Sequence, residues 1–212
     1  MNPTITPPTY PLRPINGGPL DKAQPKTGLW YYEPKYNGWR TLVHVPTGTM
    51  FNRNGERLSI AKEFTLALEE LQEIHDPICK LEWLDCEALE RRHNLGRGLL
   101  LALDLLDEAA QPYSVRRELL EELFPTAPLD PVWANPAERG VSSPHVYLSP
   151  TPPYDGRANP VSIWEELQAI NKAWGCQFYE GLVAKRADSL YPFQLRSPAV
   201  EFPFWIKHRW AF

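Results

Sequence analysis

The segment 30–40 constrains this chain most, because it joins a strand pattern to one conspicuous lysine. Aromatic residues, which favour strands, occupy 30–32, and Pro34 then stiffens the backbone just before Lys35. Gly38 gives the backbone freedom three residues later. The pattern predicts a strand that carries Lys35 near its end, where the amine is either an ordinary exposed group or a nucleophile.

The rest of the chain alternates short strands with helices. With 23 prolines in 212 residues, many short extended segments are favoured over long helices. Hydrophobic spacing predicts three helices, at 61–75, 114–124 (capped by Ser114) and 161–174. Apolar or β-branched runs predict strands at 30–33, 41–45, 49–51, 81–89, 99–106, 146–148, 182–184 and 202–210.

Composition indicates one folded domain preceded by an arm. Residues 1–28 are rich in Pro, Gly and Thr and predict an extended arm, and 29–212 predict the domain. No apolar run is long enough to cross a membrane, and no secretory leader pattern is present. Scattered cysteines at 79, 86 and 176 favour reduced thiols and a cytoplasmic location. A net charge of −4 argues against a protein that coats nucleic acid, but it allows a local basic groove.

A pair of carboxylates interrupts the apolar run at 81–89. Asp85 and Glu87 are two residues apart, so in a strand both side chains point to the same face. Two carboxylates on one face repel unless a cation or sugar hydroxyls lie between them. The pair therefore indicates a binding face, and the alternative is one exposed acid beside one salt-bridged acid.

Two later segments place charges on short strands. Glu180 precedes an apolar stretch that ends in Lys185. The acid could bind a divalent metal through oxygen and the lysine could face phosphate, with a surface ion pair as the alternative. Lys207 and Arg209 share one face of the last strand, which suits a polyphosphate or a nucleic-acid backbone, or else a solvated edge strand.

Taken in order, these segments resemble the motifs of ATP-dependent polynucleotide ligases and mRNA capping enzymes. The first is similar to the K-x-D-G-x-R motif that carries that family's nucleophile. The matching segments are 35–40 (KYNGWR), 53–55 (RNG), 84–89 (LDCEAL), 101–106 (LALDLL), 180–185 (EGLVAK) and 205–209 (WIKHR). The resemblance implies an α+β covalent nucleotidyltransferase fold, with mostly antiparallel sheets flanked by helices.

The resemblance also implies a covalent reaction at Lys35. Its amine would attack the α-phosphorus of ATP, expel pyrophosphate and carry AMP as a phosphoramidate. The AMP would pass to the 5′-phosphate at a nick in duplex nucleic acid, and the 3′-hydroxyl would then displace it. Lys185, Lys207 and Arg209, with Mg²⁺ or Mn²⁺, would screen the triphosphate charge.

Further site residues are implied by their positions in the motifs. Glu180 would be a metal ligand, and Glu87 would contact the ribose and metal-bound water. Arg40 and Arg53 would hold the ribose or the phosphate end of the nick. Glu33, two residues before the lysine, would accept a hydrogen bond from the adenine amino group.

Three positions depart from the family pattern. Asn37 stands where the family has an aspartate, so its contact to a metal through water would be weaker. Cys86 replaces the glycine of the D-G-E motif. Leu103 replaces an aromatic residue that stacks on the base, so adenine would be held there by apolar contact.

Family ligases usually continue into an OB-fold domain after the last motif, and we expect no such domain here. We therefore expect a single-domain enzyme that self-adenylates slowly, needs a protein partner in place of that domain, or acts mainly on pre-adenylated ends. The pattern at 116–120 (RRELL) resembles the DNA ligase branch and favours DNA sealing, as in repair. The alternatives are an RNA ligase, a capping-type guanylyltransferase, and a catalytically weak module that binds a nucleotide or nucleic acid.

Overall fold

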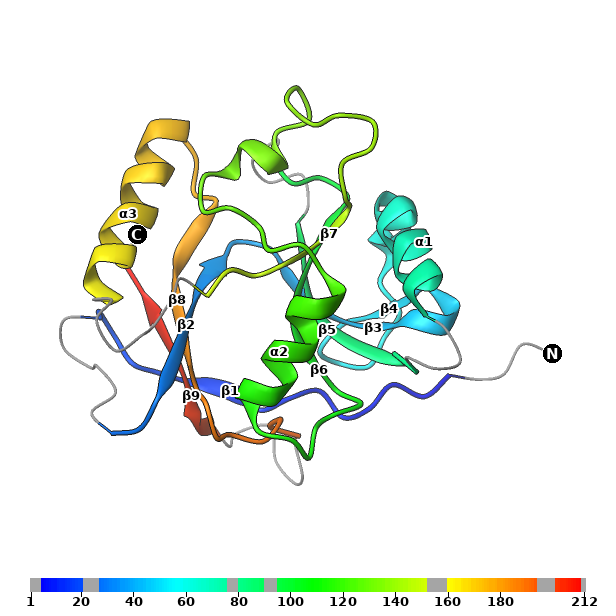
Figure 1. The fold of residues 1–212 in the computed structure, drawn as a ribbon, viewed down its shortest axis with the longest axis horizontal. Coiled ribbons are helices and arrows are strands. Elements are labelled where there is room, and N and C mark those ends of the chain that lie inside the picture. Colours follow the sequence, from blue (N-terminus) through cyan, green and yellow to red (C-terminus); the bar gives the residue numbers. More distant parts are fainter. Residues whose placement is uncertain are drawn as a thin grey trace.

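Two β-sheets flanked by helices form the molecule (Figure 1). The computed structural model describes residues 5–20, 27–75, 80–89, 95–151, 160–193 and 201–210. Within these ranges the α-helices are α1 (Thr65–Ile74), α2 (Tyr113–Leu123) and α3 (Pro160–Trp174). The strands are β1 (Arg13–Asn16), β2 (Trp30–Tyr36), β3 (Trp39–His44), β4 (Thr49–Phe51), β5 (Trp83–Leu89), β6 (Leu99–Leu105), β7 (Val146–Leu148), β8 (Tyr179–Arg186) and β9 (Glu201–Arg209).

The strand order is β1-β9-β8-β2 in one sheet and β4-β3-β5-β6-β7 in the other. Neighbouring strands are antiparallel except for the parallel pairs β1–β9 and β6–β7. Helices α1 and α2 flank the larger sheet, and α3 packs against β8 of the smaller one (Figure 1). The predicted α+β class with mostly antiparallel sheets is therefore confirmed. None of the helices in the described ranges has the length and apolar character needed to span a bilayer.

The larger sheet owes its stability to an apolar layer beneath its helices. Leu71 of α1 and Leu120 of α2 are fully buried against Leu84 of β5 and Leu100 of β6. Burying each such side chain contributes about 1.5–3 kcal/mol relative to leaving it in water. This layer fixes β5 and β6, and with them the acidic residues that the two strands carry.

The ends of two predicted helices differ from expectation. Residues Ser59–Phe64 form a 3-10 helix, and α1 begins only at Thr65, as is frequent at helix starts. Ser114 does not cap α2, which already begins at Tyr113. Pro112 precedes this helix, and its carbonyl accepts the first intrahelical hydrogen bonds, so no side-chain cap forms.

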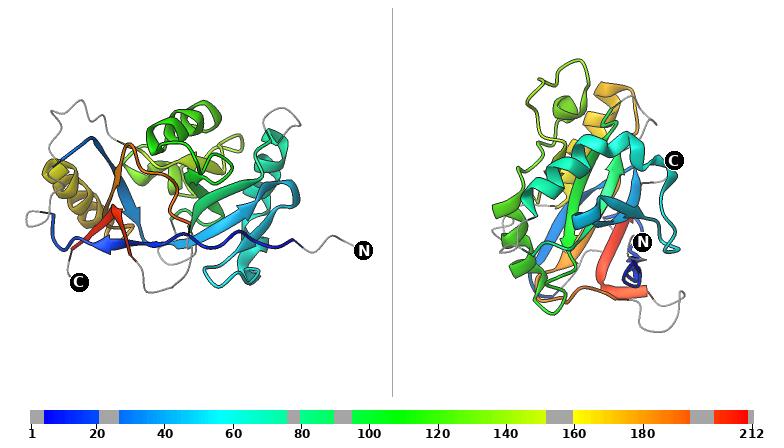
Figure 2. Two further views of the ribbon diagram at one scale, coloured as in Figure 1. Left: turned by 90° about the horizontal axis from the view of Figure 1, so that it is seen from below. Right: turned by 90° about the vertical axis from the view of Figure 1, so that its right-hand side faces the viewer.

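The N-terminal segment contains a strand that the sequence did not predict. β1 runs parallel to β9, with Ile15 opposite Ile206 and Asn16 opposite Lys207. The segment passes along one side of the molecule, from the edge of the larger sheet to β9 (Figure 2). Residues 1–4 and 21–26 of the expected arm lie outside the described residues, as does Cys79, and the division at residue 28 stays a prediction.

Candidate active site

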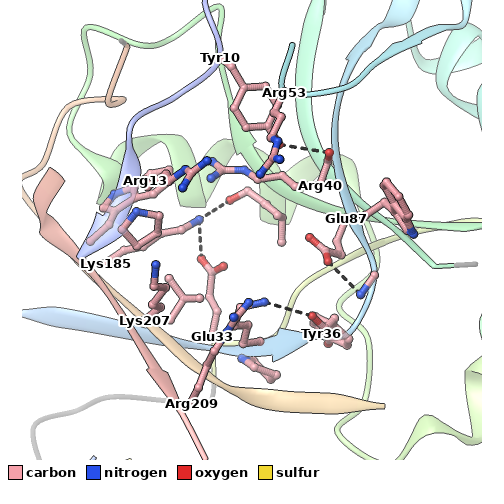
Figure 3. A pocket seen from close by; sticks show the side chains of 18 of the residues that line it. Tyr10, Arg13, Glu33, Tyr36, Arg40, Arg53, Glu87, Lys185, Lys207 and Arg209 are labelled. Carbon is pink, nitrogen blue, oxygen red and sulfur yellow. Dashed lines mark hydrogen bonds and ion pairs between the residues drawn. The ribbon is translucent and has the colours of Figure 1, made fainter. Parts of the chain in front are cut away.

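A cavity of about 600 Å³ lies where the two sheets meet, a size typical of small-ligand sites. Its wall is built from both sheets and from the N-terminal segment (Figure 3). Most of the site residues expected from the sequence line it, namely Glu33, Lys35, Arg40, Arg53, Glu87, Leu103, Lys185, Lys207 and Arg209. Residues far apart in the chain therefore converge on one space.

Lys35 lies near the end of β2, opposite Gly181 of β8. Its Nζ is 2.7 Å from Oε2 of Glu180, and Nη2 of Arg209 is 3.0 Å from the same oxygen. The lysine side chain remains 19 % exposed. One carboxylate thus orients two cations at the edge of the cavity. Gly181 has φ +146°, and a Cβ there would lie 1.9 Å from the carbonyl oxygen of His208, so only glycine allows β8 and β9 to approach this closely.

Glu87 holds the turn that follows the lysine. Its Oε1 accepts a hydrogen bond of 3.0 Å from the backbone N–H of Gly38. A Cβ at this glycine would lie 2.7 Å from the carbonyl oxygen of Ala88. Glycine is therefore required because the backbone packs directly on β5. The same contact fixes Glu87 beside Lys35.

Asp85 and Glu87 perform different structural tasks. Asp85 is fully buried and binds the guanidinium of Arg40 through both oxygens, with Nε to Oδ1 at 2.9 Å. The Tyr191 hydroxyl donates to the same carboxylate at 2.8 Å. The cation that the two adjacent acids were expected to need is thus supplied by Arg40. This guanidinium lies 5.3 Å from the ring centre of Trp205, so it faces the cavity from a fixed position.

Glu33 and Lys185 form a buried ion pair in the wall. Their charged groups lie 2.9 Å apart, and each side chain is 3 % exposed. Lys185 also donates to the carbonyl oxygen of Leu103 at 2.7 Å, while the hydroxyl of Tyr113 donates to Glu33. The carboxylate expected to contact adenine and the ammonium expected to contact phosphate therefore neutralise each other's charge in this conformation. Tyr113 was missed because nothing in its local sequence distinguishes it from a core aromatic.

Asn37, like Glu180, is an expected site residue that does not line the cavity. It is not among the residues of the cavity wall, and its side-chain amide donates to the carbonyl oxygen of Gln177 at 3.1 Å. Leu103 does line the wall, and Arg53 reaches it from the turn after β4. The ligand roles expected for Asn37, Leu103 and Arg53 stay predictions.

Positive charges gather along β9. Burial lowers the pKa of Lys207, and the neighbouring charges of Arg209, Arg13 and Lys35 lower it further, against the opposing carboxylate of Glu201. Arg13 comes from β1 and lines the cavity, as does Tyr10 just before it. The sequence did not point to either residue, because the strand that carries Arg13 is not evident from its own pattern.

A divalent metal in this site would be held by Glu87 and Glu180. No group of three or more His, Cys, Asp or Glu side chains in the described ranges is placed to hold an ion. Mg²⁺, however, is usually held by one or two carboxylates together with substrate phosphates. Glu87 lines the cavity and Glu180 contacts Lys35 at its edge, so this pair fits such a shared site.

Glu87 should make the folded protein less stable as the pH rises. Burial is the main cause that raises its pKa from 4.5 to about 7, against the opposing charges of Lys35 and Arg40. The folded protein therefore binds more protons than the unfolded chain between these values. The stabilising contribution is complete below pH 4.5 and is lost as the pH rises through 7.

Glu87→Gln tests this coupling, because the amide oxygen can still accept from Gly38 and the group no longer titrates. Relative to the parent protein, the variant should gain about 3 kcal/mol in free energy of unfolding between pH 4.5 and pH 8. Urea unfolding at the two pH values, with EDTA present, measures this. Glu165→Gln on the exposed face of α3 is the control. If the free energy of unfolding of Glu87→Gln changes between the two pH values by the same amount as that of Glu165→Gln, Glu87 is not the group that causes the pH dependence.

The architecture is that of the adenylation domain of ATP-dependent DNA ligases. One solved structure with this fold is the ligase domain of M. tuberculosis LigD, at a TM-score of 0.51 and 19 % identity, matching 93 % of this chain and 59 % of that one. Chlorella virus DNA ligase-adenylate matches at a TM-score of 0.52 and 15 % identity, over 92 % of this chain and 67 % of that one. A Lig E DNA ligase matches at 0.51 and 14 %, over 93 % and 68 %.

These similarities concern the fold. The chain spans less than two thirds of the M. tuberculosis ligase domain. No protein-family model matches the sequence, and no curated protein sequence matches it.

Proposed function

We propose that the protein is an ATP-dependent nucleic-acid ligase that works through a lysyl-AMP intermediate on Lys35. The observation that carries the proposal is the setting of this lysine. It lies at the edge of a cavity of ligand size, beside Glu180 and close to the cations of β9. A nucleophilic amine next to fixed positive charge suits attack on a triphosphate, because negative charge develops on the phosphate oxygens.

The chemistry has three steps. The amine nitrogen of Lys35 forms a bond to the α-phosphorus of ATP, and pyrophosphate leaves. The 5′-phosphate of the nick then takes the AMP from the lysine, which regains its amine. Finally the 3′-hydroxyl attacks the activated phosphate, forms the phosphodiester and releases AMP. The lysine must lose a proton before the first step, and Oε2 of Glu180, 2.7 Å from Nζ, is an acceptor in reach.

Several groups of the cavity would contribute without reacting. Arg40 is held by Asp85 and Arg53 is exposed at the rim, so both could bind ribose or the phosphate of a nick. A divalent metal held by Glu87 and Glu180 would add charge that stabilises the transferring phosphoryl group. Adenine recognition by Glu33 would require sharing its oxygens with Lys185.

A DNA substrate is part of the proposal, and the similarity of fold to DNA ligases supports it. The pattern at 116–120 no longer does so independently. Arg116 and Arg117 are buried, and they bind Asp104 and the carbonyl oxygen of Ser149 instead of facing the cavity. An intracellular setting, where ATP and nicked duplexes occur, belongs to the same proposal, as does a protein partner in place of an OB-fold domain.

Labelled nucleotide tests the proposal directly. With Mg²⁺ or Mn²⁺, labelled ATP should leave an acid-labile label on the protein, and GTP should leave none. A nicked DNA duplex should then be sealed, and a pre-adenylated nick should be sealed without ATP. Label from GTP alone would indicate a capping-type guanylyltransferase, and sealing of RNA alone an RNA ligase. No label and no sealing would leave a binding module of the same fold.

A further inference from the structure

The cavity carries more positive charge than its carboxylates balance. Its other cations are accounted for by ion pairs, which join Arg40 to Asp85, Lys185 to Glu33, and both Lys35 and Arg209 to Glu180. Within the described residues, no ion pair to a carboxylate engages Arg13, Arg53 or Lys207, although all three line the wall. This excess lies in a chain whose net charge is −4, so the cavity is built for an anion.

Arg13 is held in place on both sides. On one side the backbone N–H of Leu12 donates to the carbonyl oxygen of Pro192 at 2.7 Å. On the other, the N–H of Gly17 donates to the carbonyl oxygen of Lys207 at 3.0 Å, and Leu20 is buried in the core. The exposed arginine therefore projects from a fixed strand, on the same side of the cavity as Lys207 (Figure 3).

We propose that Arg13 and Lys207 bind the β- and γ-phosphates of the nucleotide, and that Arg13 retains the pyrophosphate as it leaves. Arg13, Lys35, Lys207 and Arg209 all line the same cavity, and the charges of the other three act on Lys207, which places the four cations around one phosphate chain. An arginine is suited to this task because its planar donors bind phosphate oxygens in pairs and it stays charged. The assignment rests on the proposed lysine adenylation.

Arg13→Gln separates this role from a contact to nucleic acid. The variant should adenylate Lys35 with a kcat/KM for ATP about 10- to 100-fold lower, the loss expected for one charge-assisted contact. It should also be less inhibited by pyrophosphate. Sealing of a pre-adenylated nick, which needs no triphosphate, should be unchanged. Arg13→Lys should recover part of the loss. Arg57→Gln, exposed and outside the cavity wall, is the matched control.

The outcomes are distinguishable. A variant as active as the parent with ATP would overturn the assignment, and so would a variant impaired only with the pre-adenylated nick, which would assign Arg13 to nucleic acid. If the parent protein forms no label, the proposed function fails, and calorimetry with inorganic tripolyphosphate still tests the site. In that case Arg13→Gln should weaken binding about 10-fold or more relative to Arg57→Gln. Equal affinities of the two variants for tripolyphosphate would contradict an anion site at Arg13.

Discussion

Replacing Lys35 by alanine should abolish covalent labelling from ATP, lowering the rate by at least about three orders of magnitude. The variant loses the nitrogen that forms the phosphoramidate, which lies 2.7 Å from Oε2 of Glu180. The fold should persist, because the side chain is partly exposed and lies at a strand end. Labelled ATP followed by denaturing electrophoresis measures the effect, and circular dichroism checks the fold.

Lys35→Arg sharpens the test, because it keeps the positive charge and the ion pair with Glu180 but removes the nucleophile. A guanidinium stays protonated and does not attack phosphorus. Labelling should therefore be lost in this variant as completely as in Lys35→Ala. Lys172→Ala on the exposed side of α3 should label like the parent protein. Label that survives in Lys35→Arg would mean that another residue is the nucleophile and that Lys35 serves only as a charge.

Local sequence patterns are sufficient to predict most of the strands. The segments at 41–45, 49–51 and 146–148 each carry β-branched or aromatic residues between turn residues, and each became a strand at nearly the expected bounds. β1 could not be predicted in this way. Arg13–Asn16 has a proline and no alternating pattern, and it becomes a strand only because β9, from the far end of the chain, pairs with it.

The ion pairs of the site show a second limit of prediction from the sequence. The sequence gives the charge that each strand presents, but it does not say which of two opposite charges will meet. Arg40 and Lys185 were both expected to face a ligand, and both are paired with buried carboxylates of neighbouring strands. Such pairing depends on register and packing between strands far apart in sequence.

Loss of the Arg116–Asp104 ion pair should lower the free energy of unfolding more than a substitution of an exposed residue does. Both side chains are fully buried, and the guanidinium binds the carboxylate through Nε at 2.6 Å and Nη2 at 3.0 Å. It also donates to the carbonyl oxygen of Ser189 at 3.1 Å. Arg116→Leu would leave the buried carboxylate of Asp104 with only the ammonium of Lys185, 3.9 Å away, as an opposite charge, at a cost of about 3–5 kcal/mol in free energy of unfolding. Urea titration measures this.

A double variant separates the effect of the ion pair on stability from the effect of the packing of the arginine side chain. Arg116→Leu with Asp104→Leu removes both charges, so it should recover a large part of the stability that the single variant loses, because no unpaired charge remains buried. Arg186→Leu, whose partner Asp188 is at the surface, is the control and should change stability little. If Arg116→Leu behaves like this control, α2 is held to β6 by its apolar contacts alone. If instead the double variant is no more stable than the single one, the loss comes from the packing of the arginine side chain and from its hydrogen bond to the carbonyl oxygen of Ser189.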